Sequence, residues 1–105
     1  MKKYNKLVRD NIPTIIKNDG GKCKFKIADK YDFNYLLYDK LFEEVNEFIK
    51  KPCIEEIADI LEVIDVICKN NNFSLDEIKK VKTNKRKERG SFFKRIFLVE
   101  ATNKK

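Results

Sequence analysis

Two adjacent segments with the apolar periodicity of α-helices constrain this chain more than any other feature of its sequence. Apolar residues recur every three or four positions from about Phe33 to Lys50 and again from about Cys53 to Lys69. Lys51-Pro52 breaks the pattern between them, and proline is tolerated only near the start of a helix. The sequence therefore predicts two amphipathic helices joined by a short connection.

The flanking segments predict one further helix and two short strands. Ser74 and Glu77 have the spacing of a capping box, which predicts a helix from there to about Lys87, ended by Gly90. Polar and apolar residues alternate over 22–27, and 93–99 is rich in aromatic and β-branched residues, so these segments are predicted to pair as strands. At 105 residues, the chain has the length of one domain, 1–105. The predicted fold is mainly α, a helical bundle with a small two-stranded β element.

Acidic residues occur on the apolar sides of the two long predicted helices. At about 100° per residue, Glu44 falls between Phe33 and Leu37, and Glu56 falls within the apolar arc of its helix. Glu47 and Asp59 lie one turn along from these two acids. If the helices pack antiparallel, the four carboxylates converge.

Inward-facing carboxylates need a positive partner, because burying an isolated charge costs several kcal/mol. A lysine or arginine from elsewhere in the chain is one such partner, and a divalent cation is another. The chain has three cysteines and no histidine, so oxygen ligands dominate, and these suit Mg²⁺ or Mn²⁺ better than zinc. Magnesium often binds together with substrate phosphates, which predicts a polyphosphate substrate.

The charge of the chain is polarised along its length. The net charge is +7, but Asp39–Asp65 holds nine acids against three lysines, whereas Lys79–Arg95 holds nine basic residues against one acid. The basic stretch fits phosphate binding. The acidic block repels phosphate unless a cation intervenes, so the charge pattern argues against a simple nucleic-acid binder.

Four sequence segments together resemble one enzyme superfamily. They are EEVNE at 43–47, EIAD at 56–59, YNKLVRD at 4–10 followed by Ile12-Pro13, and RGSF at 89–92. On these segments the chain resembles the MazG-like and phosphoribosyl-ATP pyrophosphohydrolase-like superfamily of all-α nucleotide pyrophosphohydrolases. The resemblance implies Mg²⁺-dependent cleavage of a nucleoside triphosphate, or a related nucleotide, between the α and β phosphates. The products would be a monophosphate and pyrophosphate.

The resemblance also implies roles for particular residues. The metal ligands would be Glu44, Glu47, Glu56 and Asp59, and either Glu47 or Glu43 would help to deprotonate the attacking water. Charge and position in the flanking segments add candidates for phosphate contacts: Lys6, Arg9, Lys85 and Arg89. The active unit is expected to be a homodimer or a homotetramer.

Two other functions stay open at this stage. One is hydrolysis of phosphoribosyl-ATP in histidine biosynthesis, which uses the same carboxylates on a bulkier substrate. The other is a non-enzymatic module that binds nucleic acid or an acidic partner through its basic C-terminal stretch. The sequence has no apolar run long enough for a membrane span and no signal-peptide pattern, so we expect a cytoplasmic protein.

Overall fold

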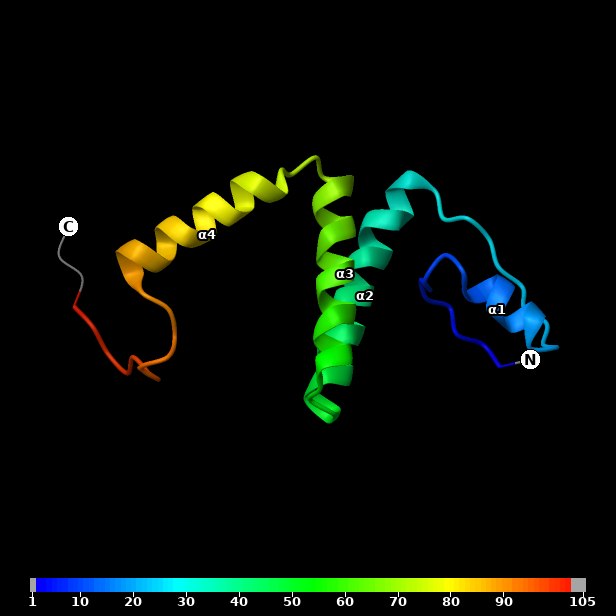
Figure 1. Cartoon of the computed structure of the whole chain (residues 1–105), viewed down its shortest axis with the longest axis horizontal. Coiled ribbons are helices and arrows are strands. Elements are labelled where there is room, and N and C mark those ends of the chain that lie inside the picture. The colour runs from blue at the N-terminus through cyan, green and yellow to red at the C-terminus, as the bar shows by residue number, and fades with distance from the viewer. Residues whose placement is uncertain (1, 103–105) are drawn as a thin grey trace. The chain divides into compact units, whose positions relative to one another are not determined.

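The computed structural model describes residues 2–102, and every helix in that range is an α-helix (Figure 1). The elements are α1 (Ile12–Asn18), α2 (Lys30–Lys50), α3 (Ile54–Asn70) and α4 (Leu75–Arg89). Packing divides the chain into two units, with the boundary in the sequence between Phe73 and Ser74. The mainly α class is confirmed, whereas the single domain stays a prediction.

The first unit is organised by α2 and α3, which lie side by side (Figure 1). The Asn70 side chain donates a hydrogen bond to that of Asn34, while Glu44 approaches Glu56 and Asp59. The beginning of α2 thus lies beside the end of α3, which makes the pair an antiparallel hairpin. Leu37 of α2 and Val63 and Cys68 of α3 are the buried apolar side chains among the described residues.

The sequence predicted the ends of these helices to within a few residues. Asp29 caps α2 by accepting a hydrogen bond from the backbone N–H of Asp32 at 2.8 Å, so the helix begins three residues before the predicted start. Pro52 lies just before Cys53, the residue that precedes the first turn of α3. The sequence analysis did not predict α1, a helix of only seven residues whose first turn contains a proline.

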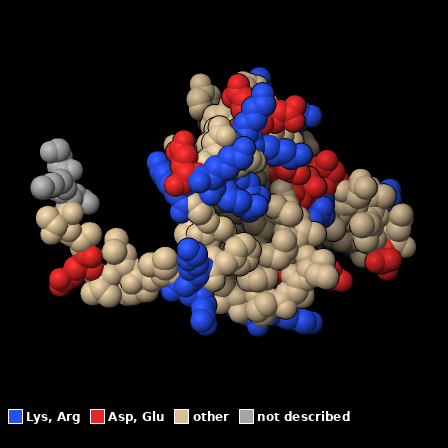
Figure 2. Space-filling view, turned by 60° about the vertical axis from the view of Figure 1, so that its left-hand side comes forward, with Lys and Arg blue, Asp and Glu red and all other residues tan. Residues whose placement is uncertain are grey.

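In the second unit, α4 begins and ends where the sequence indicated. The Ser74 hydroxyl accepts a hydrogen bond from the backbone N–H of Glu77 at 3.3 Å, as in the predicted capping box. Gly90 ends the helix with φ of +80°, a conformation that glycine adopts without steric cost. Figure 2 turns the side of Figure 1 on which α4 is labelled toward the viewer, and lysine and arginine side chains gather in that view.

The predicted two-stranded β element is wrong for the described residues. Neither 22–27 nor 93–99 forms a strand, and large apolar side chains in both segments are exposed, including Ile27 and Phe97. A lone pair of strands is at best marginally stable in water unless one of its faces packs against another element. Alternation of polar and apolar residues indicates only that a segment could bury one face as a strand. In this structure neither segment buries a face, so the pattern did not lead to a strand.

Candidate metal and phosphate site

Of the four acids that the sequence analysis expected to converge, three meet across the α2–α3 hairpin, and Glu47 does not join them. Carboxylate oxygens of Glu44, Glu56 and Asp59 lie within 4.8 Å of one another, and all three residues are partly buried. We call these three side chains the carboxylate cluster. Glu44 comes from α2, and Glu56 and Asp59 lie one turn apart on α3. The antiparallel packing of the helices therefore creates the cluster.

The electrostatics of the cluster are shown most clearly by Glu56. Burial raises the pKa of its carboxyl group, and the nearby charges of Asp59, Glu44, Glu47 and Glu55 raise it further. Proximity of like charges disfavours the ionised form, so a cation placed among these oxygens would relieve the repulsion.

The dimensions of the cluster can be compared with those of a magnesium site. At Mg–O distances of 2.0–2.1 Å, neighbouring oxygens of an octahedron lie about 3 Å apart and opposite ones about 4 Å apart. The cluster's oxygens lie within 4.8 Å of one another, so the span of the cluster is close to that of such an octahedron. The donor set is all carboxylate, which suits Mg²⁺ or Mn²⁺. The residues present therefore fit such an ion.

Cationic side chains from the N-terminal segment contact the acids of the hairpin. The Arg9 guanidinium donates a hydrogen bond to Asp59 at 2.7 Å, and Lys6 donates one to Glu43 at 2.6 Å. The first contact raises the pKa of Arg9, and the second raises the pKa of Lys6. Two of the predicted phosphate-binding residues are therefore next to the predicted metal and base residues.

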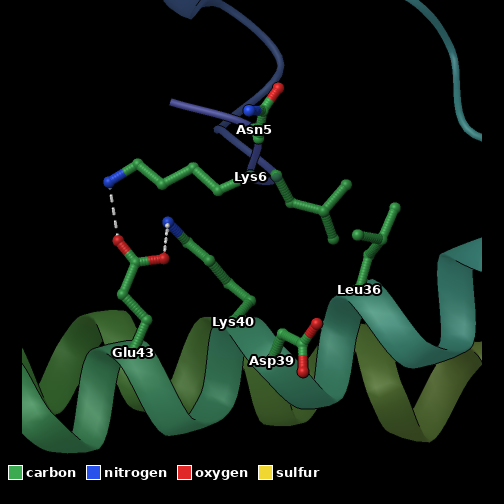
Figure 3. Close-up of a pocket in the computed structure, with 7 residues that line it drawn as sticks. Asn5, Lys6, Leu36, Asp39, Lys40 and Glu43 are labelled. Carbon is green, nitrogen blue, oxygen red and sulfur yellow. Dashed lines mark hydrogen bonds and ion pairs between the residues drawn. The ribbon is translucent and has the colours of Figure 1, made fainter. Parts of the chain in front are cut away.

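Lys40 is a further part of this site that the sequence analysis did not single out. Its ammonium group lies 3.2 Å from one oxygen of Glu43 and 3.4 Å from Glu44. Figure 3 shows Lys6 and Lys40 approaching the two oxygens of the Glu43 carboxylate from different elements. The signal was present in the sequence, because residues three and four apart on a helix are neighbours.

The two candidates for the general base have different surroundings. Partial burial acts to raise the pKa of Glu43, but the hydrogen bonds and charges of Lys6 and Lys40 outweigh it and lower the pKa. Glu47 is exposed and takes part in no ion pair within residues 2–102. It is not one of the three acids of the cluster, but its charge contributes to the raised pKa of Glu56.

The remaining predicted phosphate ligands, Lys85 and Arg89, are exposed residues of α4 in the second unit.

Within residues 2–102 no helix is long and apolar enough to cross a bilayer. Searches of protein-family models, curated proteins and solved structures found no match to this chain.

Proposed function

We propose that this protein is a nucleotide pyrophosphohydrolase that depends on Mg²⁺ or Mn²⁺. It would cleave a nucleoside triphosphate, or a related nucleotide, between the α and β phosphates. The observation that carries the proposal is the convergence of Glu44, Glu56 and Asp59 across the hairpin, with Arg9 at its edge. This juxtaposition agrees with the resemblance of the sequence to the MazG-like superfamily.

In the proposed site, three carboxylates would hold the metal. Glu44, Glu56 and Asp59 supply oxygens from both helices, and Glu47 is a fourth candidate ligand one turn from Glu44. A bound divalent ion would polarise the phosphoryl group and lower the pKa of a coordinated water. The protein contributes the fixed placement of these ligands on two packed helices, which are more rigid than loops.

Glu47 is better suited than Glu43 to accept the proton of the attacking water. Glu43 is held by two lysines, and its lowered pKa makes it a weaker base than an ordinary glutamate. Glu47 is exposed and free of such ion pairs within the described part of the chain. We therefore assign Glu47 as the residue that accepts the proton. Glu43 instead positions Lys6 and Lys40, which both donate hydrogen bonds to it.

Cationic side chains at the edge of the cluster would bind the phosphates. Arg9 and Lys6 are exposed, so their charged ends can turn from the acids toward a bound polyphosphate. Arginine can bind phosphate oxygens through two parallel hydrogen bonds, whereas lysine acts as a point charge. Lys85 and Arg89 are further candidates, on charge and on their place in the sequence.

The proposal is tested by incubating the full-length protein with Mg²⁺ and a panel of standard and modified nucleotides, including phosphoribosyl-ATP, while following pyrophosphate release. Asp59→Asn should reduce turnover at least 100-fold, because it removes both a metal ligand and the partner of Arg9. Asp65→Asn is the matched control, since Asp65 is an exposed acid of the same helix outside the cluster. It should leave turnover within about twofold.

Three results would contradict the proposal: no turnover of any nucleotide, release of orthophosphate instead of pyrophosphate, or full activity in Asp59→Asn.

The α4 helix carries seven basic residues, all exposed, so nucleic-acid binding is the competing function. Such binding would weaken steeply with added salt and would not respond to Asp59→Asn.

A further inference from the structure

One side of α4 carries basic side chains along most of its length. At about 100° per residue, an arc of about 120° around the helix contains five lysines and arginines, and from residue 79 onward it contains no other residue type. The five are Lys79, Lys82, Lys85, Arg86 and Arg89, and we call them the basic face. The three acids of the helix lie outside this arc. At 1.5 Å per residue, the basic face is about 15 Å long.

The charge of the basic face is open to solvent. All five residues are exposed, and within residues 2–102 none of them takes part in an ion pair. Like charges this close along a helix repel one another, which costs stability that no contact within the second unit offsets. An anionic partner would relieve the repulsion.

A turn with exposed aromatic rings follows the basic face directly in the chain. Its backbone is ordered by a hydrogen bond at 3.1 Å from the N–H of Arg95 to the carbonyl of Phe92. Phe92 and Phe93 are 93% and 90% exposed, and Phe97, just after the turn, is 87% exposed. Lys94 lies between these phenylalanines and, with Arg95, adds two positive charges. The turn thus combines open aromatic rings with cations.

This combination fits a single strand of nucleic acid. Basic side chains along a path can follow the phosphates, and aromatic rings can stack on bases, whose faces are free only outside a paired duplex. Stacking tolerates any base, because every base has a flat aromatic face. Neither contact involves the 2′-hydroxyl group that distinguishes RNA from DNA. We therefore expect similar affinity for the two kinds of strand.

The sequence of α4 argues against a membrane surface as the partner. A helix that lies in the interface of a bilayer needs an apolar face along its length. The apolar residues of α4 are Leu75, Ile78 and Val81, all in its first half, and none occurs from Lys82 to Arg89. The aliphatic residues after the turn would suit a bilayer, so lipid vesicles are one arm of the test.

We propose that the basic face of α4 and the phenylalanines of the following turn together bind single-stranded nucleic acid. This is a second function, carried by the second unit and separate from the proposed hydrolysis. It requires neither the carboxylate cluster nor a divalent ion. Because Lys85 and Arg89 are also candidates for nucleotide phosphates, the test changes the other three residues of the basic face.

The test is a fluorescence-anisotropy titration of labelled DNA and RNA strands of about 20 nucleotides with the full-length protein in EDTA. For single strands, the logarithm of the association constant falls with that of the salt concentration by about 0.7 for each phosphate contacted. The triple variant Lys79→Gln, Lys82→Gln, Arg86→Gln should make this slope less steep by about 2 and weaken binding at least tenfold at low salt. The control removes the same charge from an exposed segment of the first unit, as Lys22→Gln, Lys24→Gln, Lys26→Gln, and should bind within about threefold of the wild-type protein.

A second variant tests the aromatic contacts and does not depend on whether α4 tolerates three substitutions. Phe93→Ala combined with Phe97→Ala should weaken binding at least fivefold and leave the salt slope unchanged, because it removes stacking and no charge. Phe25→Ala is its control, since Phe25 is 64% exposed and lies in the first unit. A duplex of the same sequence should bind at least tenfold more weakly than the strand, because its base faces are covered.

Several outcomes would overturn the proposal. They are equal losses in the two charge variants, unchanged affinity in the phenylalanine variant, equal affinity for strand and duplex, and binding to vesicles of anionic lipid without binding to either strand. Because Asp59→Asn should bind strands as the wild-type protein does, a failure of hydrolysis and a failure of strand binding give separate results.

Discussion

The Arg9–Asp59 ion pair leads to a prediction in which metal binding and hydrolysis change in opposite directions. The guanidinium lies 2.7 Å from Asp59, one of the three acids of the carboxylate cluster. Because Arg9 carries a positive charge at this carboxylate, it competes with a metal that takes Asp59 as a ligand. Arg9→Gln removes the competitor and should tighten the binding of Mn²⁺ or Mg²⁺ alone, while hydrolysis slows because a phosphate contact is lost.

The size of the effect on metal binding follows from the exposure of the ion pair, and that of the effect on hydrolysis from the lost phosphate contact. The Arg9 side chain is 58% exposed and that of Asp59 is 36% exposed, so the pair belongs to the surface class, worth about 0.2–1 kcal/mol. Since 1.36 kcal/mol corresponds to a factor of ten, metal affinity should increase by about 1.4-fold to 5-fold. A hydrogen bond to a charged phosphate is worth about 1.5–3 kcal/mol, so kcat/KM should fall by roughly 10- to 160-fold.

Isothermal titration with Mn²⁺ measures the first effect, and steady-state pyrophosphate release measures the second. Lys6→Gln is the control for net charge, because it removes one positive charge near the same helices but contacts Glu43, which is not in the cluster. Metal affinity should increase more in Arg9→Gln than in Lys6→Gln. If Arg9→Gln binds metal more weakly than the wild-type protein, Arg9 is not a competitor for the site and the reasoning fails.

Three further predictions concern stability and pH. An acid whose pKa is raised in the folded protein contributes stability at low pH, and this contribution is lost as the pH rises through that pKa. Glu56→Gln should therefore raise the melting temperature of the metal-free protein at neutral pH. The same substitution should weaken Mn²⁺ binding at least tenfold. A lower melting temperature in EDTA would show that Glu56 is not repelled by its neighbours. Leu37→Ala should cost about 2–4 kcal/mol in urea unfolding, because Leu37 is only 4% exposed; a loss below 1 kcal/mol would mean that the α2–α3 contact is loose. Ser74→Ala should cost about 1 kcal/mol and speed amide exchange in α4, and unchanged exchange would contradict the cap.

The helices were predictable because their signals are local. Periodicity, the Ser74–Glu77 capping box and Gly90 act within one or two turns of chain, and the structure places α2, α3 and α4 close to the predicted ranges. The short strands were not predictable in this way, because a strand exists only if another segment offers it a backbone partner. The seven residues of α1 are too few to show a period.

The candidate site was predictable in part for the same reason. The helical wheel showed that Glu44 and Glu56 point inward, but not which residues would reach them. The N-terminal contacts of Lys6 and Arg9 join positions 37 and 50 residues apart in sequence, and no local pattern encodes such a pairing. Phe42 and Leu61 were likewise apolar positions in the sequence, and only packing reveals that they are exposed.

By itself, the sequence determined the three longer helices, α2, α3 and α4, and the side of α2 and α3 on which the acids lie, because both follow from short-range backbone geometry. The tertiary structure decided that three of these acids meet within 4.8 Å and that Arg9 contacts one of them. These outcomes depend on the direction in which one helix packs against another. That direction is set by contacts between residues distant in the chain.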